Sequence, residues 1–348
     1  LTVAGQWMRR KLIPFYSWCV PEYTEILTRE GWKTYDQLRV GEEALTYNIQ
    51  KRTTEWQEVQ DKAAYPFDGD LVTIQNSYGF KYQFTEDHRV VVIEKYKDQR
   101  KVVLAKDLKT HQHIPLVAPH EFTGVSVLSE TDAALLGWLV TDGYFRVRAK
   151  SPNSFEAMLY QKKAECVELI RDKFAEYISS ESVHPETGVI CFRLKAAKLG
   201  EIRKVFGSKD DLPGIVTQLG EKECQAMYDA MLAAEGTAVN GFVAFPQNNG
   251  PVLGAFQILC YMLGKAGHIR PKTCRGKEQH SLYVKKGDKI QLSKWKNTRE
   301  HYNGMVWCPK TENGTWIMRQ NGKVMITGNC EINAPRYVRL FHNLPMEG

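Results

Sequence analysis

Features typical of exported, membrane-bound or zinc-binding proteins are missing from the 348-residue sequence. It contains no apolar run of the roughly 20 residues that a membrane-spanning helix needs. The basic residues Arg9, Arg10 and Lys11 are not followed by the apolar segment of a secretory signal peptide. The eight cysteines form no Cys-x-x-Cys pair, which argues against a zinc site built on such pairs. We therefore expect reduced thiols and a cytoplasmic location.

The composition is that of an ordinary globular protein, with 43% hydrophobic and 25% charged residues. Its length predicts about two or three domains. The net charge of +7 is uneven, because Lys and Arg outnumber Asp and Glu in residues 261–310. Such a region favours a polyanionic partner, although a solvated lysine-rich loop has the same composition. The sequence begins with Leu1, and we expect it to be a fragment of a longer reading frame.

Two stretches near the ends of the chain carry matching chemistry. Residues 324–330 end in Gly328, Asn329 and Cys330, and residues 19–26 open with Cys19. The carboxamide nitrogen of Asn329 can attack its own backbone carbonyl, close a five-membered imide and cut the chain. A cysteine on either side of the segment can attack an acyl group. We interpret Cys19 and Asn329 as the two ends of one self-excising segment.

Short strands dominate the regions next to these ends. Alternating segments at 24–28, 44–47, 55–60, 71–75, 81–85 and 89–94 are separated by Gly, Asp and Asn, which predicts a compact all-β unit. Further strands are predicted at 305–309, 315–319 and 324–327. The Asn-Gly pairs at 313–314 and 321–322 predict hairpin turns between them.

Thr85 and His88 stand three residues apart at a predicted strand end. Their side chains can converge on one backbone group, where the hydroxyl forms a hydrogen bond and the imidazole donates a proton to a departing amine. The alternative is that His88 is a turn histidine without a chemical role.

Taken in order, residues 19–28, 85–88 and 327–330 resemble the motifs of an intein, a Hint-type protein-splicing element. The resemblance implies an all-β, horseshoe-like splicing domain made of residues 19–120 and 291–329, which needs no cofactor. It also implies host-protein flanks (exteins) in cis at 1–18 and 330–348, with Trp18 and Gly328 at the splice junctions. The residues to which it assigns catalytic roles are Cys19, Thr85, His88, Cys308, Asn329 and Cys330.

The chain departs from the intein pattern where a histidine usually precedes the terminal Asn. Gly328 occupies that position. Inteins usually carry a second histidine in the strand region before the last hairpin, and residues 305–328 contain none. Both histidines assist Asn cyclisation in the family, so we expect slow splicing or another proton donor. Cys308 falls where inteins carry Asp or Cys to coordinate the two cleavages; alternatively it is a buried cysteine without a function.

A second resemblance lies in residues 121–290. Gly137, Asp142 and Gly143 match the signature of LAGLIDADG homing endonucleases, and Ala230 and Glu235 occupy corresponding positions in a looser copy. The resemblance implies an α+β domain of two pseudo-symmetric halves. Its paired carboxylates bind Mg²⁺ and cut double-stranded DNA. The alternative for either motif is a buried helix that ends in a capped carboxylate.

The rest of this region predicts helices at 162–177 and 252–264, a helix start near Thr131, and strands at 144–147, 188–194 and 242–245. Basic side chains on or after these strands are candidates for phosphate contacts, although a solvated strand face explains them as well. The candidates are Arg146, Arg148, Lys150, Lys162, Lys163, Lys285 and Lys286.

The sequence thus predicts a mixed fold, in which an all-β splicing domain is interrupted by an α+β endonuclease domain. We expect a monomer with no membrane partner. Two rival hypotheses remain: a host nucleic-acid enzyme in which Cys19 and Cys330 are passive, and a maturase-like DNA-binding module. Splicing activity distinguishes the first from our interpretation, and DNA nicking distinguishes the second.

Overall fold

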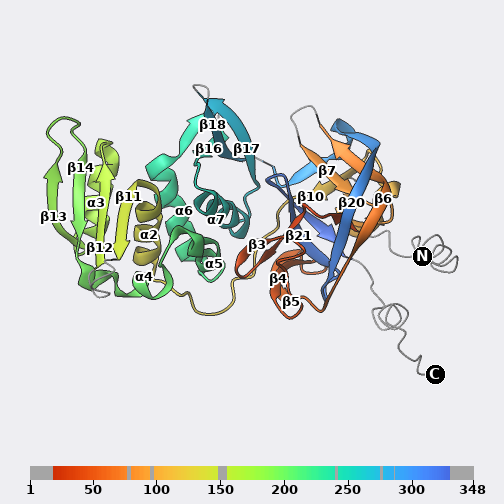
Figure 1. The fold of residues 1–348 in the computed structure, drawn as a ribbon, viewed down its shortest axis with the longest axis horizontal. Coiled ribbons are helices and arrows are strands. Elements are labelled where there is room, and N and C mark those ends of the chain that lie inside the picture. The colour runs from red at the N-terminus through yellow and green to blue at the C-terminus, as the bar shows by residue number, and fades with distance from the viewer. Residues whose placement is uncertain are drawn as a thin grey trace. The chain divides into compact units, whose positions relative to one another are not determined.

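The structure is a computed structural model, which describes residues 19–76, 80–94, 98–147, 155–239, 242–274, 277–285 and 287–329. The described chain is mostly β, with several sheets and few helices. It divides into two compact units. Unit 1 takes residues 19–28, 32–119 and 287–329, and unit 2 takes residues 29–31 and 120–285 (Figure 1).

Unit 1 is built almost entirely of strands. Its N-terminal elements are β1 (Val20–Pro21), β2 (Glu25–Thr28), β3 (Gly31–Lys33), β4 (Glu43–Asn48), β5 (Thr53–Glu58), β6 (Asp61–Gln75), β7 (Lys81–Phe84), β8 (Arg89–Glu94), β9 (Gln99–Leu104), η2 (Ala105–Asp107) and β10 (Gln112–Pro115). Its C-terminal elements are β19 (Lys289–Gln291), η5 (Leu292–Lys294), β20 (Lys296–Lys310), β21 (Thr315–Gln320) and β22 (Lys323–Gly328).

Both ends of the sequence contribute to the same sheets in unit 1. One sheet has the strand order β1-β20-β6-β7, and another has the order β19-β10-β8-β9. Strand β21 pairs with β22 on one side and with β2 on the other, and β2 pairs with β4, which pairs with β5. Residues near the start and the end of the described part of the chain therefore lie side by side.

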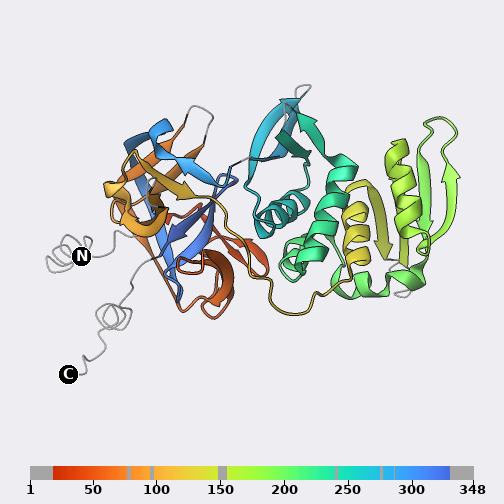
Figure 2. The same ribbon diagram turned by 180° about the vertical axis from the view of Figure 1, so that it is seen from behind.

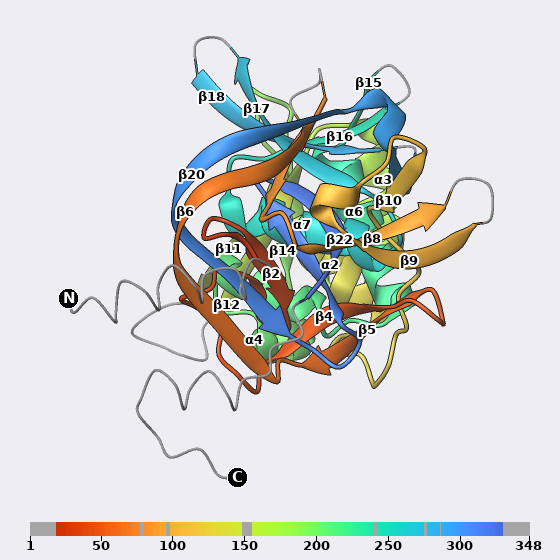
Figure 3. The ribbon, with the colours of Figure 1, turned by 90° about the vertical axis from the view of Figure 1, so that its right-hand side faces the viewer.

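The longest pairing joins β6 and β20, which run together as a curved two-stranded ribbon (Figure 3). Their register is continuous from Asp61 opposite Lys310 to Gln75 opposite Lys296. Only residues 71–74 of β6 and 306–309 of β20 are buried, and these segments lie at opposite ends of the ribbon. Each strand is therefore buried in the core at one end. Along the rest of the strand, most side chains alternate between half-buried and exposed positions.

Unit 2 contains the same order of elements twice. The first set is α2 (Glu130–Asp142), β11 (Gly143–Val147), β12 (Phe155–Gln161), α3 (Ala164–Phe174), β13 (Ile178–Val183) and β14 (Ile190–Leu194). The second set is α6 (Glu221–Glu235), β15 (Thr237–Val239), β16 (Phe242–Pro246), α7 (Gly250–Met262), β17 (Gly267–Cys274) and β18 (Lys277–Val284). Between them lie η3 (Ala196–Leu199), α4 (Gly200–Val205), η4 (Lys209–Asp211) and α5 (Leu212–Val216).

The strand pairings repeat as well. The first set has the order β11-β12-β14-β13, and the second pairs β15 with β16, β16 with β18 and β18 with β17. The predicted helices and strands of this region are confirmed. Helix α2, however, starts before Thr131, because the hydroxyl of Ser129 accepts the backbone N–H of Asp132 as the N-cap.

Helices α2 and α6 pack directly against each other at the centre of unit 2 (Figure 2). A Cβ atom on Gly137 would lie 2.9 Å from the carbonyl oxygen of Met227 and 3.0 Å from the Cβ of Ala230. The glycine is therefore needed where the two backbones approach most closely. Among the described helices, none combines the length and the apolar character that crossing a membrane requires.

Candidate functional sites

The first candidate site surrounds Cys19, whose side chain is buried in unit 1. Thr85 holds both backbone groups of this residue. The N–H of Cys19 donates to Thr85 Oγ1 at 2.7 Å, and the Thr85 hydroxyl and backbone N–H donate to the Cys19 carbonyl at 3.1 and 3.0 Å. The nitrogen held in this way is the one that joins Cys19 to the preceding residue. The Thr85 hydroxyl therefore fixes the orientation of this nitrogen by accepting its N–H, while its own hydrogen is donated to the Cys19 carbonyl.

His88 links this site to the C-terminal strand. Its ring is fully buried, stacks on Phe84 with centroids 5.1 Å apart, and has Nε2 at 2.7 Å from Thr327 Oγ1. Its backbone N–H donates to the carbonyl of Thr85 at 3.0 Å. A chain of hydrogen bonds therefore runs from Cys19 through Thr85 and His88 to Thr327.

Asn329, two residues after Thr327, is also held in the core of unit 1. Its backbone N–H donates to the carbonyl of Gly314 at 2.9 Å. Its Nδ2 donates to the carbonyl and the hydroxyl of Thr311 at 3.2 and 3.1 Å. Asn329 directly follows β22, the strand that carries Thr327 and lies beside β8.

Gly328 fits closely between strands. Its carbonyl accepts a hydrogen bond from Trp316 Nε1 at 2.9 Å. A Cβ atom here would lie 2.6 Å from the carbonyl oxygen and 2.8 Å from the Cβ of Arg89. The backbone of β8 therefore occupies the space that a side chain at position 328 would need.

Cys308 shares a buried cluster with Cys19 and Val306, and Tyr65 and Phe67 pack against it. Strand pairing explains why the two cysteines are neighbours. Val20 lies opposite Trp307 in an antiparallel pair, and Cys19 precedes Val20 while Cys308 follows Trp307. Cys308 thus lies in the same buried cluster as Cys19. The remaining predicted residues of this site, Trp18 and Cys330, lie outside the described residues.

The second candidate site lies in unit 2, at the ends of α2 and α6. Asp142 Oδ2 accepts a hydrogen bond from Gln161 Nε2 at 2.9 Å, and Glu235 Oε2 accepts one from Gln247 Nε2 at 2.8 Å. Burial raises the pKa of Asp142. Burial and then the charge of Asp142 raise the pKa of Glu235 to about 7. The two carboxylates therefore lie close enough to repel each other.

This carboxylate pair suits a divalent cation, because a cation would relieve the repulsion of two partly buried negative groups. The described residues contain no cluster of three or more His, Cys, Asp or Glu side chains, so water or phosphate oxygens would have to complete the coordination.

The predicted basic residues are dispersed. Arg146 is exposed on β11, opposite Glu156, and Lys162 is exposed just after β12. Lys163 instead donates from Nζ to the carbonyls of Ala234 and Ala233 at 2.8 and 3.3 Å, at the C-terminal end of α6 beside Glu235. Lys285 follows β18 and is half-buried. The other three candidates, Arg148, Lys150 and Lys286, fall outside the part of the chain that the structure describes.

Sequence reasoning missed four polar residues of these sites: Thr311, Thr327, Gln161 and Gln247. Gln161 binds Asp142 and also accepts the backbone N–H groups of residues 162 and 163 at 2.8 and 2.9 Å. Gln247 accepts the N–H of Asn249 in the same manner. Gln161 lies at the end of β12, and Gln247 directly follows the corresponding strand β16. This correspondence can be recognised only when the repeated topology is known.

No protein-family model and no curated protein matches the chain. Similar solved structures include the AceL NrdHF class 3 split intein, a GSH-linked splice-inactive variant, at 8% identity and a TM-score of 0.35, covering 90% of this chain and 98% of that one. I-DmoI in complex with DNA and Mn matches at 16% identity and a TM-score of 0.31, covering 45% of this chain and 89% of that one.

The homing endonuclease I-WcaI, bound to its DNA recognition sequence, matches at 14% identity and a TM-score of 0.30, covering 46% of this chain and 77% of that one. The solved structures similar to this chain thus include a split intein and homing endonucleases. None of the three reaches a TM-score of 0.5, so the function proposed below depends on the geometry of the chain's own residues.

Proposed function

We propose that the chain is an intein that excises residues 19–329 and joins Trp18 to Cys330. The observation that carries the proposal is the buried chain of hydrogen bonds from Cys19 through Thr85 and His88 to Thr327. It supports the view that the N-terminal and C-terminal junctions are handled in one place, although more than 300 residues separate them in the sequence.

In the proposed first step, Cys19 Sγ attacks the carbonyl of Trp18 and converts the amide to a thioester. Thr85 holds the departing nitrogen through its hydroxyl, and His88 donates the proton that this nitrogen gains. Cys330 then attacks the thioester and takes over the acyl group. In this proposal the proximity of the reacting groups supplies the rate.

In the second half of the reaction, the Asn329 carboxamide closes on its own carbonyl and releases the excised segment. A shift from sulfur to nitrogen at Cys330 then leaves a peptide bond between the flanks. Cys308, which packs beside Cys19, would coordinate the two cleavages. No cofactor enters these steps.

The proposed domains are flanks at 1–18 and 330–348, a horseshoe-like splicing domain at 19–120 and 291–329, and an endonuclease domain at 121–290. We propose that the repeated order of elements in unit 2 corresponds to two pseudo-symmetric halves of a LAGLIDADG fold. Their exposed sheet residues, Arg146 among them, would contact the phosphates of a double-stranded homing site.

For the endonuclease, Asp142 and Glu235 would hold a divalent ion, with Mg²⁺ as our choice. The bound ion would activate water and stabilise charge at the scissile phosphate. Gln161 and Gln247 orient the two carboxylates through their side-chain N–H groups. Lys163 neutralises the carbonyl end of α6 next to Glu235.

Splicing is tested by incubating the full chain with thiol and following its mass. We expect a ligated product of residues 1–18 and 330–348, which Cys19→Ala and Asn329→Ala each abolish. Thr54→Val, which changes a buried hydroxyl of β5 that donates to the carbonyl of Pro119, is the matched control. A chain that stays intact in thiol while fully folded contradicts the proposal.

The endonuclease is tested with DNA that carries the uninterrupted host-gene site, with and without Mg²⁺. Asp142→Asn should abolish cutting while leaving salt-dependent DNA binding in place. Equal cutting by Asp142→Asn and by the parent would refute the assignment of this residue.

A further inference from the structure

Among the described residues, Thr311 provides both hydrogen-bond acceptors for the side chain of Asn329. Asn329 is 2% exposed, and its Nδ2 donates both to the carbonyl and to the hydroxyl of Thr311. The Thr311 hydroxyl donates its own hydrogen to the carbonyl of Thr315 at 2.8 Å. Toward Asn329 this hydroxyl therefore acts only as an acceptor.

Two acceptors on one residue determine the orientation of the carboxamide. If the carboxamide turned over, Oδ1 would face two oxygen atoms that offer it no hydrogen. Thr311 and Asn329 are both nearly inaccessible to solvent, so water does not replace the lost contacts. The nitrogen, rather than the oxygen, is thus fixed at the Thr311 side.

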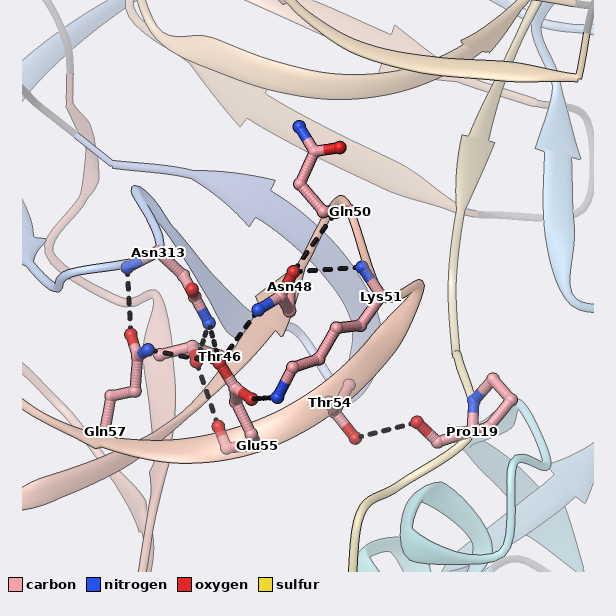
Figure 4. A network of polar contacts seen from close by, with 9 residues as sticks. All are labelled: Thr46, Asn48, Gln50, Lys51, Thr54, Glu55, Gln57, Pro119 and Asn313. Atoms are coloured by element: carbon pink, nitrogen blue, oxygen red, sulfur yellow. Dashed lines mark hydrogen bonds and ion pairs between the residues drawn. The ribbon is translucent and has the colours of Figure 1, made fainter.

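The turn that carries Thr311 is itself anchored to strands β4 and β5 (Figure 4). The N–H of Asn313 donates to Gln57 Oε1 at 2.9 Å, and its Nδ2 donates to Thr46 Oγ1 at 3.0 Å and Glu55 Oε1 at 2.8 Å. The hydrogen bond from Asn313, followed by those from Lys51 and Asn48, holds the pKa of Glu55 below its usual value. The acceptors for Asn329 therefore belong to a braced turn.

The backbone of Asn329 is tied to the same turn. Its N–H donates to the carbonyl of Gly314, and the preceding carbonyl, that of Gly328, accepts from Trp316. Both the main chain and the side chain of Asn329 are thus positioned by residues 311–316.

We propose that Thr311 is a positioning residue for Asn cyclisation, which holds Asn329 Nδ2 as the attacking atom where inteins usually employ histidines. The inference rests on the splicing function proposed above. In this step a bond forms between Nδ2 and the carbonyl carbon of Asn329, and the bond from that carbon to the nitrogen of Cys330 breaks. Nδ2 loses one proton, and the departing nitrogen gains one. By accepting both N–H groups, Thr311 increases the electron density on the nitrogen and selects the reactive orientation.

The test isolates cyclisation from the first step. In the full chain with Cys19→Ala, release of residues 330–348 is followed by mass spectrometry. We expect Thr311→Val, which removes the hydroxyl acceptor, to release this peptide about tenfold more slowly, the effect of one buried hydrogen bond. Thr311→Ser should restore the rate to within about twofold, because it retains the acceptor. Thr54→Val should have no effect.

Cleavage at the N-terminal junction distinguishes a positioning role of Thr311 from a merely structural one. In the full chain with Asn329→Ala, thiol-induced cleavage before Cys19 should proceed equally with Thr311 and with Thr311→Val. A parental release rate for Thr311→Val in the first assay overturns the inference. So does an equal loss at both junctions that Ser does not rescue. If the Cys19→Ala chain releases no peptide and the unsubstituted chain forms no ligated product, the proposed splicing function fails together with the inference.

Discussion

Placing a histidine at position 328 gives opposite expectations from the sequence and from the structure. Inteins usually carry histidine there, so the resemblance implies that Gly328→His accelerates Asn cyclisation. The structure implies the reverse, because a Cβ at this position would lie 2.6 Å from the carbonyl oxygen of Arg89. Real Cβ atoms essentially never approach a heavy atom within 3.0 Å. The contact is with backbone, so a rotamer change does not relieve it.

The only relief is a separation of β8 and β22 by several tenths of an ångström. Overpacking of this kind in a close-packed core costs about 1–3 kcal/mol of folding free energy. The same displacement would lengthen the 2.7 Å contact between His88 and Thr327, which directly precede Arg89 and Gly328. Loss of that contact costs about 0.5–1.5 kcal/mol, or up to roughly tenfold in rate. Gly328→His should therefore impair the N-terminal step as well as cyclisation.

The assay compares the parent, Gly328→Ala and Gly328→His. Thiol-induced cleavage in an Asn329→Ala background reports the first step, and peptide release in a Cys19→Ala background reports cyclisation. Urea denaturation reports stability, and both position-328 variants should unfold at lower urea concentration. Gly254→Ala is the control, since a Cβ there meets no atom within 4 Å. If Gly328→His is as stable as the parent and cyclises faster, the packing argument is refuted.

Three further outcomes follow from the two sites. Thr85→Val should slow thioester formation about tenfold by removing the hydroxyl from the Cys19 nitrogen, with Thr85→Ser near the parent in the same thiol assay. Because the pKa of Glu235 is raised to about 7 from 4.5, the folded chain keeps a proton that the unfolded chain loses between these values. The stability of the protein should therefore fall as pH rises from 4.5 to 7, and urea titrations of Glu235→Gln should lack this component. Asp142→Asn should lower the pKa of Glu235, measured by NMR titration, because the charge of Asp142 is one of its causes.

In the two longest strands, the sequence predicted only the segments where apolar residues cluster. The structure confirms strands at residues 71–75 and 305–309, but β6 and β20 are each 15 residues long. The remaining residues of both strands are half-buried or exposed, and many are polar. Their composition therefore resembles that of loops. Pairing along the whole ribbon, rather than local propensity, makes these segments strands.

The hairpin turn predicted at residues 321–322 is confirmed, because its chemistry is local. Asn321 and Gly322 both have positive φ, at 49° and 75°, as an Asn-Gly hairpin turn requires. The hairpin predicted at residues 313–314 is wrong: Gly314 has φ at 68°, but the strands on either side of this turn, β20 and β21, pair with other strands and lie in different sheets. Polar partners of the sites were not predictable, since a single Thr or Gln has no spacing to identify it. Gln161 and Gln247 become related only through the repeated topology of unit 2, and Thr311 only through its contact with Asn329.

One physical explanation accounts both for the absence of histidine at position 328 and for the contact of Thr311 with Asn329. Strand β8 packs so closely on β22 that position 328 has no room for a side chain, and this packing is what places His88 against Thr327. An imidazole at 328 would therefore compete with the contact that connects the two junctions. The side chain of Asn329 instead points to the braced turn at residues 311–314, where Thr311 supplies two acceptors without needing space in the strand interface. The glycine at position 328 is thus consistent with the packing around it, and the residue that we propose to orient Asn329 lies on another element.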